Sequence, residues 1–173
     1  MEGGSSRAAF QMRLASMKLD AGVLPLKVQV HIAAKNVQSM RAETRFQDGL
    51  AELDAGEHDL VFLSEIGRSE LPEVLKTPRQ GKLYLSGGFA FHGVGSYIAP
   101  KFCKSISGIC FHAISAQLCI LPFSFHGRKF PTYSWCFPTS WDNDSVVELY
   151  SALILMLETA MPLAAIPILG GEF

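Results

Sequence analysis

Three polar residues of the chain, Asn36, Glu65 and Glu172, each come at the end of an apolar segment with the pattern of a β-strand. If these strands are neighbours, their ends gather one amide and two carboxylates at one edge of a sheet, where α/β folds commonly bind ligands. Such oxygen ligands suit Mg²⁺ better than Ca²⁺, because magnesium needs few protein ligands and completes its octahedron with water and substrate phosphate. The chemistry implied is metal-dependent cleavage of a phosphate ester.

Each of the three residues also has a structural interpretation. Asn36 could cap the end of a strand, since asparagine is common in turns. Glu65 directly follows apolar residues, where an unpaired carboxylate is costly to bury, so metal binding, pairing with an arginine and exposure to solvent all remain open. Glu172 could equally be exposed to solvent.

Other residue types give weaker indications of chemistry. The five histidines show no H-E-x-x-H spacing. The four cysteines are too far apart for a C-x-x-C pair, so we interpret them as reduced thiols, with a disulfide or a metal site as alternatives. The glycines at 87–88 and 93–95 do not form a G-x-G-x-x-G turn, and no nucleotide cofactor is expected.

Hydrophobic periodicity predicts the elements that position the first two polar residues. Residues 28–34 alternate between apolar and polar side chains, as in a strand with one buried face. Residues 46–53 have the spacing of an amphipathic helix, which Gly56 ends. Residues 59–63 are apolar and predict a buried strand. Strand, helix and strand form a crossover unit, which predicts two parallel strands.

The middle of the chain predicts short strands. The stretch 72–88 is rich in proline and glycine and is interpreted as a long surface loop around a short strand at 82–85. Four further β-rich segments predict an antiparallel meander: residues 93–99, 107–112, 117–125 and 132–137.

A second helix is predicted from Asp144, with Ser145 and Glu148 spaced as a capping box, and it ends before Pro162. Charged and proline residues interrupt the apolar stretch 149–169, so no membrane span is expected.

Composition is that of one domain with an apolar core: 173 residues, 49% hydrophobic, 18% charged and a net charge of -1. A charge so close to zero gives no general attraction to nucleic acid, so DNA binding would need a local basic patch. Residues 1–26 lack the apolar core of a signal peptide and are expected to form a flexible leader. We therefore expect an intracellular protein, cytoplasmic or nuclear, that is not secreted.

The sequence resembles the endonuclease/exonuclease/phosphatase superfamily, and most of all its non-LTR retrotransposon endonuclease branch, which includes the sequences called craniofacial development protein 2-like. The resemblance rests on four ordered segments: residues 32–40, 59–65, 92–95 and 137–142. It runs from about residue 28 to 173 and covers the N-terminal part of the family's domain, so 27–173 is expected to be a partial domain, truncated at its C-terminal side.

The resemblance implies a four-layer α/β sandwich of the deoxyribonuclease-I-like type. It also implies that Asn36 helps to hold metal and phosphate and that Glu65 is a magnesium ligand. The family's G-D-x-N motif resembles Gly171-Glu172-Phe173, with glutamate in place of aspartate; its asparagine, and the family's final aspartate and histidine, would fall beyond residue 173.

Two further positions depart from the family pattern. Cys136 stands where an aromatic or histidine proton donor is usual, and a thiol does not provide the same donor. Lys35 stands where this branch usually has tryptophan. With an incomplete active site, efficient hydrolysis is not expected.

The first hypothesis is therefore a truncated, diverged endonuclease-like domain, ancestrally hydrolysing DNA phosphodiester bonds with magnesium, and weakly active or inactive in this chain. An alternative is a non-catalytic module that binds DNA or protein through loop 72–88 or through the basic pairs Lys101/Lys104 and Arg128/Lys129. A third is a mobile-element relic without function.

Overall fold

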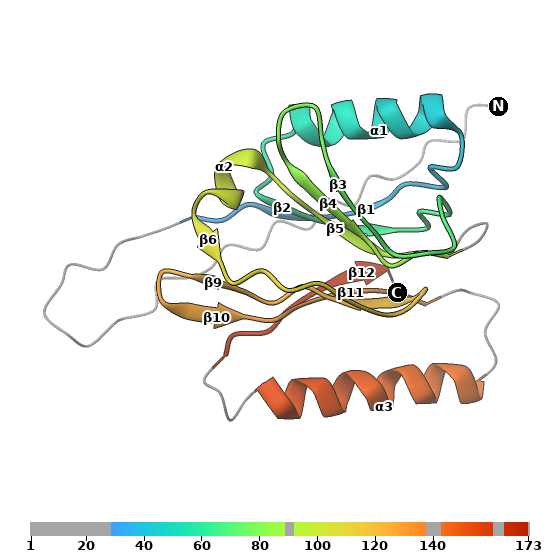
Figure 1. Ribbon diagram of the computed structural model, residues 1–173. Coiled ribbons are helices and arrows are strands. Elements are labelled where there is room, and N and C mark those ends of the chain that lie inside the picture. Colours follow the sequence, from blue (N-terminus) through green and yellow to red (C-terminus); the bar gives the residue numbers. More distant parts are fainter. Residues whose placement is uncertain (1–28, 89–91, 138–142, 161–164, 173) are drawn as a thin grey trace, which may run out of the picture.

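The computed structural model describes residues 29–88, 92–137, 143–160 and 165–172, and the expected leader 1–26 lies outside them. The described chain forms four layers: a helix, two β layers packed face to face, and a second helix on the far side (Figure 1). The predicted four-layer α/β sandwich is confirmed.

The first sheet has the strand order β1-β2-β5-β4-β3. Its strands are β1 (Ile32–Asn36), β2 (Leu60–Ser64), β3 (Glu73–Lys76), β4 (Lys82–Leu85) and β5 (Gly95–Ile98). β1 and β2 are parallel, as the predicted crossover requires, and the other pairings are antiparallel. β3 was not predicted. It pairs with β4 in a hairpin and carries alternating half-buried and exposed side chains within the stretch interpreted as loop.

The second β layer comprises two sheets. One has the order β12-β11-β8-β7, made of β7 (His112–Ser115), β8 (Leu118–Ile120), β11 (Thr132–Cys136) and β12 (Ile168–Glu172). β12 runs parallel to β11, because α3 carries the chain back along the layer before β12 begins (Figure 1).

The other sheet of this layer has the order β10-β9-β6, made of β6 (Ile106–Ser107), β9 (Phe123–Phe125) and β10 (Arg128–Phe130). The predicted meander is therefore wrong as a single unit: β5 belongs to the first sheet, and the later strands divide between two sheets. Short-range alternation identifies strands but not their partners, which depend on contacts distant in the sequence.

The helices of the described residues are α1 (Glu43–Ala55), the short α2 (Pro100–Cys103), which was not predicted, and α3 (Asn143–Ala160). Gly56 follows α1 and its N–H donates to the carbonyl of Glu52, so the predicted end of this helix is confirmed. α3 begins at Asn143, one residue before the predicted start, and the predicted capping box lies outside the described residues because the side chain of Ser145 does.

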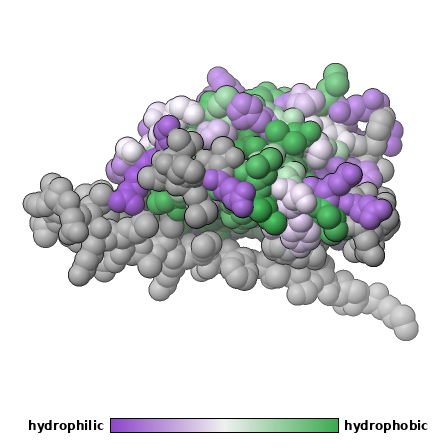
Figure 2. Space-filling view, turned by 90° about the horizontal axis from the view of Figure 1, so that it is seen from below, coloured by the Kyte–Doolittle hydropathy of each residue, from purple (hydrophilic) through white to green (hydrophobic). Residues whose placement is uncertain are grey.

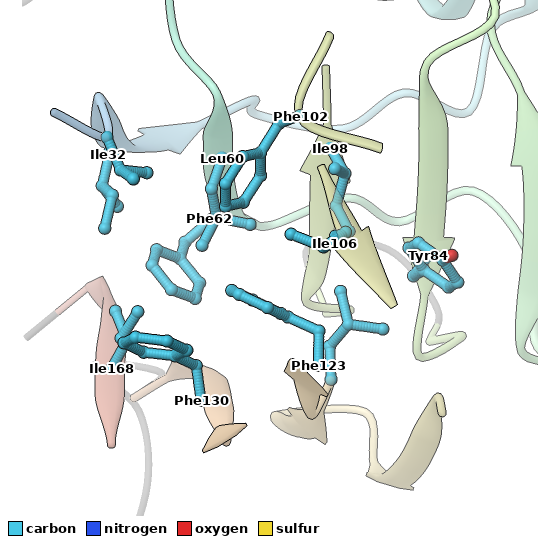
Figure 3. Packing of buried hydrophobic residues seen from close by; sticks show 12 residues of the cluster. Ile32, Leu60, Phe62, Tyr84, Ile98, Phe102, Ile106, Phe123, Phe130 and Ile168 are labelled. Atoms are coloured by element: carbon cyan, nitrogen blue, oxygen red, sulfur yellow. The ribbon is translucent and has the colours of Figure 1, made fainter. Parts of the chain in front are cut away.

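The core lies between the β layers. Leu60 and Phe62 of β2 point down from the first sheet toward Phe123, Phe130 and Ile168 of the second layer (Figure 3). Burying a side chain such as Phe62 contributes about 2 kcal/mol. All five residues of β2 are buried because α1 covers one face of this strand and the second β layer covers the other, which explains its unbroken apolar sequence.

Candidate active site

The ends of β1 and β2 lie side by side. Asn36 is the last residue of β1 and pairs with Ser64, the last residue of β2, so Glu65 is one position further on along the neighbouring strand. Parallel strands are about 4.8 Å apart. Backbone hydrogen bonds continue past the strand ends: the Val37 N–H donates to the Ser64 carbonyl at 3.1 Å, and the Ser39 N–H to the Glu65 carbonyl at 2.7 Å. The structure thus brings Asn36 and Glu65 to one edge of the sheet.

Asn36 is half-buried and takes part in a turn. Its Oδ1 accepts a hydrogen bond from the Gln38 N–H at 2.9 Å. This hydrogen bond confirms the interpretation that Asn36 takes part in a turn at the end of its strand. It does not exclude ligand binding, because an amide oxygen has two lone pairs and the turn bond fixes the direction in which the side chain points.

Glu65 is half-buried and has a left-handed backbone, with φ 55°. Among the described residues, no side-chain hydrogen bond or ion pair holds its carboxylate. The nearest arginine in sequence, Arg68, instead contacts Glu43 at 3.2 Å and Glu73 at 3.6 Å, and stacks over the Phe46 ring. Among the described residues, the Glu65 carboxylate is therefore not paired with an arginine, which removes one of the three interpretations left open by the sequence.

Left-handed backbone is concentrated at this edge. Gln38 and Ser39 have φ values of 50° and 75°, and Gly67, two residues after Glu65, has 54°. A non-glycine residue in this region costs free energy that the surrounding structure must offset, and such residues cluster at functional sites. The sequence carried no signal for this, because neither Gln38 nor Glu65 belongs to the residue types that favour a left-handed conformation.

Glu172 is the last residue of β12, and its backbone pairs with Cys136. Gly170 of the same strand lies against the Phe62 ring of β2. In Figure 1, β1, β2 and β12 all run toward the right-hand side, so the backbone of Glu172 reaches the same end of the sandwich as Asn36 and Glu65. The side chain of Glu172 lies outside the described residues.

The two positions that depart from the family pattern are both described. Cys136 ends β11 at the same edge and is buried, with its backbone N–H donating to the Gln117 carbonyl at 3.0 Å. Lys35 points away from the core between the β layers and forms an ion pair of 2.5 Å with Glu52 of α1. Lys35 therefore joins β1 to the covering helix and has no part in the candidate site.

Asn36 and Glu65 bring one amide and one carboxylate to this end of the sheet. No group of three or more histidine, cysteine, aspartate or glutamate residues that could hold a metal occurs in the described ranges. Two oxygen-bearing side chains are of the type that Mg²⁺ uses, whereas zinc sites need three or four ligands, mostly nitrogen or sulfur.

Comparisons with known proteins establish the fold. No protein-family model matches the chain, and no curated protein matches it in sequence. Among solved structures, a humanized D. rerio TDP2 carrying 14 mutations superposes with a TM-score of 0.50 at 14% identity, over 81% of this chain and 60% of that one. TDP2 is an enzyme with the exonuclease/endonuclease/phosphatase fold.

At this identity the likeness concerns the fold alone, and it agrees with the fold implied by the sequence resemblance. The chain spans 60% of the length of that structure. The retrotransposon branch stays a prediction.

No helix in the described part of the chain combines the length and the apolar character of a membrane span.

Proposed function

We propose that the chain is a diverged endonuclease-like domain whose ancestral reaction is magnesium-dependent hydrolysis of DNA phosphodiester bonds, with little or no turnover in this chain. The observation that carries the proposal is the juxtaposition of Asn36 and Glu65 at the ends of two parallel strands. The shared fold with a hydrolase such as TDP2 supports it.

In this proposal Glu65 and Asn36 are the residues that would hold the metal, which when bound would offset the charge that develops on the phosphoryl oxygens. Glu65 would provide the charged ligand. Asn36, fixed by its turn bond, would orient its amide toward the metal or a phosphate oxygen. The backbone turns that expose these two groups are held by the hydrogen bonds between the loops after β1 and β2.

Low turnover is expected because Cys136 occupies the position of the usual proton donor. Losing a positioned acid or base typically lowers a rate by about 10²–10⁴-fold. Cys136 is buried, so it is also poorly placed to exchange protons with solvent. Restoring the donor with Cys136→Tyr is the corresponding gain-of-function test, to be interpreted only where the variant remains folded.

The metal site is tested directly by Mn²⁺ binding, measured from the paramagnetic relaxation of water protons. We expect binding to the wild-type chain, loss of binding in Glu65→Gln, and a clear weakening in Asn36→Ala. Glu57→Gln is the matched control, because Glu57 is an exposed glutamate after α1. Equal Mn²⁺ binding by Glu65→Gln and wild type would contradict the proposal that Glu65 is a metal ligand.

Nicking of supercoiled plasmid with Mg²⁺ tests turnover in the same variants. We expect slow nicking or none, with any activity lost in Glu65→Gln and kept in Glu57→Gln. Rapid nicking that disappears in Glu65→Gln would support the proposed metal site and contradict the expected low turnover. Rapid nicking that persists in Glu65→Gln would contradict both the proposed metal site and the expected low turnover.

A second candidate, a DNA-binding module without catalysis, is favoured by the position of the basic residues. Lys101 lies in α2, which packs on β6, and Lys129 lies in β10 of the same three-stranded sheet. This is the left-hand end in Figure 1, opposite to the end where β1 and β2 terminate. DNA held there would not be presented to Asn36 and Glu65.

Binding of duplex DNA at several salt concentrations tests this candidate. A binding-only module should bind with an affinity that falls steeply with salt, without nicking, and Lys101→Gln combined with Lys104→Gln should weaken it. Affinity that depends on Glu65 and on divalent metal would instead favour the hydrolase proposal.

A further inference from the structure

A groove of about 540 Å³ lies between α3 and the outer face of the second β layer, away from the candidate active site. Its volume falls within the range of ligand-binding clefts, about 300–1,000 Å³. Most of its lining is apolar and includes Ile120, Pro122, Pro131, Tyr133, Leu155 and Met156. Its polar side chains among the described residues include Ser124 and Lys129.

The floor of the groove is formed by two chain segments that run side by side. Ser124 pairs with Lys129 at one end, and Ile120 pairs with Tyr133 at the other. Register partners in an antiparallel pair present their side chains on the same face. Pro122 and Pro131 lie between these two pairs along their segments, at alternate positions, and line the groove as well.

The floor is therefore graded from polar to apolar along its length. From Lys129 to Tyr133 the chain advances by four residues, which corresponds to about 14 Å in an extended strand. The wall is formed by α3, whose Met156 carbonyl accepts a hydrogen bond from the Tyr133 hydroxyl at 3.4 Å. Leu155, beside it on the helix, is 65% exposed and lies at the rim.

Lys129 gives the groove its only charge among the described lining residues. Its side chain is exposed, and no carboxylate of the described chain pairs with its ammonium group. An anion at this end would gain a charge complement, and the Ser124 hydroxyl beside it is a further hydrogen-bond donor.

We propose that this groove binds an amphipathic carboxylate, a fatty acid of medium chain length, with its carboxylate at Lys129 and Ser124 and its chain along Pro122 and Pro131 toward Tyr133. A neutral molecule would leave Lys129 unused, and a fully polar anion would leave the apolar floor and Leu155 facing water. A linear molecule with one anionic end satisfies both.

Isothermal titration of the full chain with decanoate, below the concentration at which it forms micelles, tests the proposal. We expect saturable binding with one site. Lys129→Gln should weaken decanoate binding about fivefold, the upper range for an exposed ion pair, and should leave the binding of the neutral analogue decanol unchanged. Leu155→Gln should weaken both ligands.

Lys76→Gln is the matched control, because Lys76 is an exposed lysine at the end of β3 in the first sheet, outside the groove. It should bind decanoate as the wild type does. The proposal is overturned if decanoate does not saturate, if Lys76→Gln and Lys129→Gln weaken it equally, or if Lys129→Gln weakens decanol as much as decanoate.

A membrane surface is the other source of the same anionic and apolar chemistry. Cosedimentation with vesicles that contain phosphatidylserine distinguishes this source from a free fatty acid. If the chain cosediments in a way that depends on Lys129 and does not bind monomeric decanoate, the groove binds a lipid surface and the proposal of a free fatty acid is overturned. Circular dichroism of each variant confirms that the fold is retained before binding is compared.

Discussion

The cysteine thiols differ sharply in their surroundings. Cys110 is exposed, and its Sγ lies 3.2 Å from Nε2 of His112. Cys119 is fully buried, and burial raises its pKa to about 12, against the smaller opposing effect of hydrogen bonds with Ser134. Because the thiolate is the reactive form, iodoacetamide should label Cys110 in the folded chain and leave Cys119 unmodified until the chain unfolds. Peptide mass spectrometry measures both; equal labelling rates would contradict the structure.

Asp54 joins the end of α1 to the β3–β4 hairpin. It accepts hydrogen bonds from Thr77 Oγ1 at 2.6 Å, Tyr97 OH at 2.8 Å and the Arg79 N–H at 2.9 Å. Burial by itself would raise the pKa of Asp54, but these hydrogen bonds outweigh it, and the pKa lies below its ordinary value.

A lowered folded-state pKa means that the stabilisation is complete above the unfolded-state pKa, about 3.9 for aspartate, and is lost as pH falls through the folded-state value. Asp54→Asn should lower the free energy of unfolding by about 1 kcal/mol near pH 7, because the hydrogen bonds to a charged acceptor are weakened. The difference between wild type and variant should shrink at acid pH. Urea unfolding across this pH range measures it, and a constant difference would rule out this role.

At the scale of single elements, β12 depends on the absence of a side chain at Gly170. A Cβ at this position would collide with the Phe62 ring of β2. Gly170→Ala should therefore lower the free energy of unfolding by about 2 kcal/mol, since overpacking a core costs about 1–3 kcal/mol. Gly56→Ala is the control: its Cβ would meet its nearest atom, the Leu53 carbonyl oxygen, at an ordinary 3.4 Å. Chemical denaturation measures the free energy of unfolding of both variants. An equal free energy for Gly170→Ala and Gly56→Ala would contradict the close packing of β12 on β2.

Elements with a strong local pattern were predictable, and their partners were less so. The crossover from β1 through α1 to β2 follows from periodicity because each element buries a regular set of apolar positions, such as Phe46, Leu50 and Leu53 on α1. The hairpin strand β3 was missed because its exposed Val74 lies on a strand at the edge of the sheet, where burial does not set the pattern.

The position of the candidate site was predictable from the sequence, but its local geometry was not. Placing Asn36 and Glu65 at one sheet edge required only that two parallel strands be neighbours. The bond from the Gln38 N–H to Asn36 and the left-handed backbone at Glu65 depend on how two loops meet. Periodicity contains no information on such contacts, because they involve residues outside the repeating pattern.

At the scale of the whole molecule, the outer surface of α3 is unusually apolar. Its exposed large side chains are Val147, Tyr150, Ile154 and Leu155. Figure 2 views the molecule from the side of α3 and shows apolar atoms (green) at the surface of the described residues. Exposed apolar side chains gathered on one helix favour hydrophobic association with a partner or aggregation.

Two substitutions on this helix test that surface. Ile154→Lys should reduce the fluorescence of a hydrophobic dye bound to the folded chain and raise its solubility, with no loss of helical signal in circular dichroism. Ser151→Lys, on the same exposed side of α3, adds the same charge without removing an apolar group and should change the dye signal less. An equal effect of both variants would show that charge, and not apolar area, controls dye binding.

The left-handed backbone at Glu65 bears on why this position carries an acid. Glycine adopts φ 55° without steric cost, so Glu65→Gly should raise the free energy of unfolding by about 1 kcal/mol. Denaturant unfolding of both chains measures this difference. A more stable Glu65→Gly chain would show that the carboxylate does not serve the stability of the fold, whereas a less stable one would show that it does.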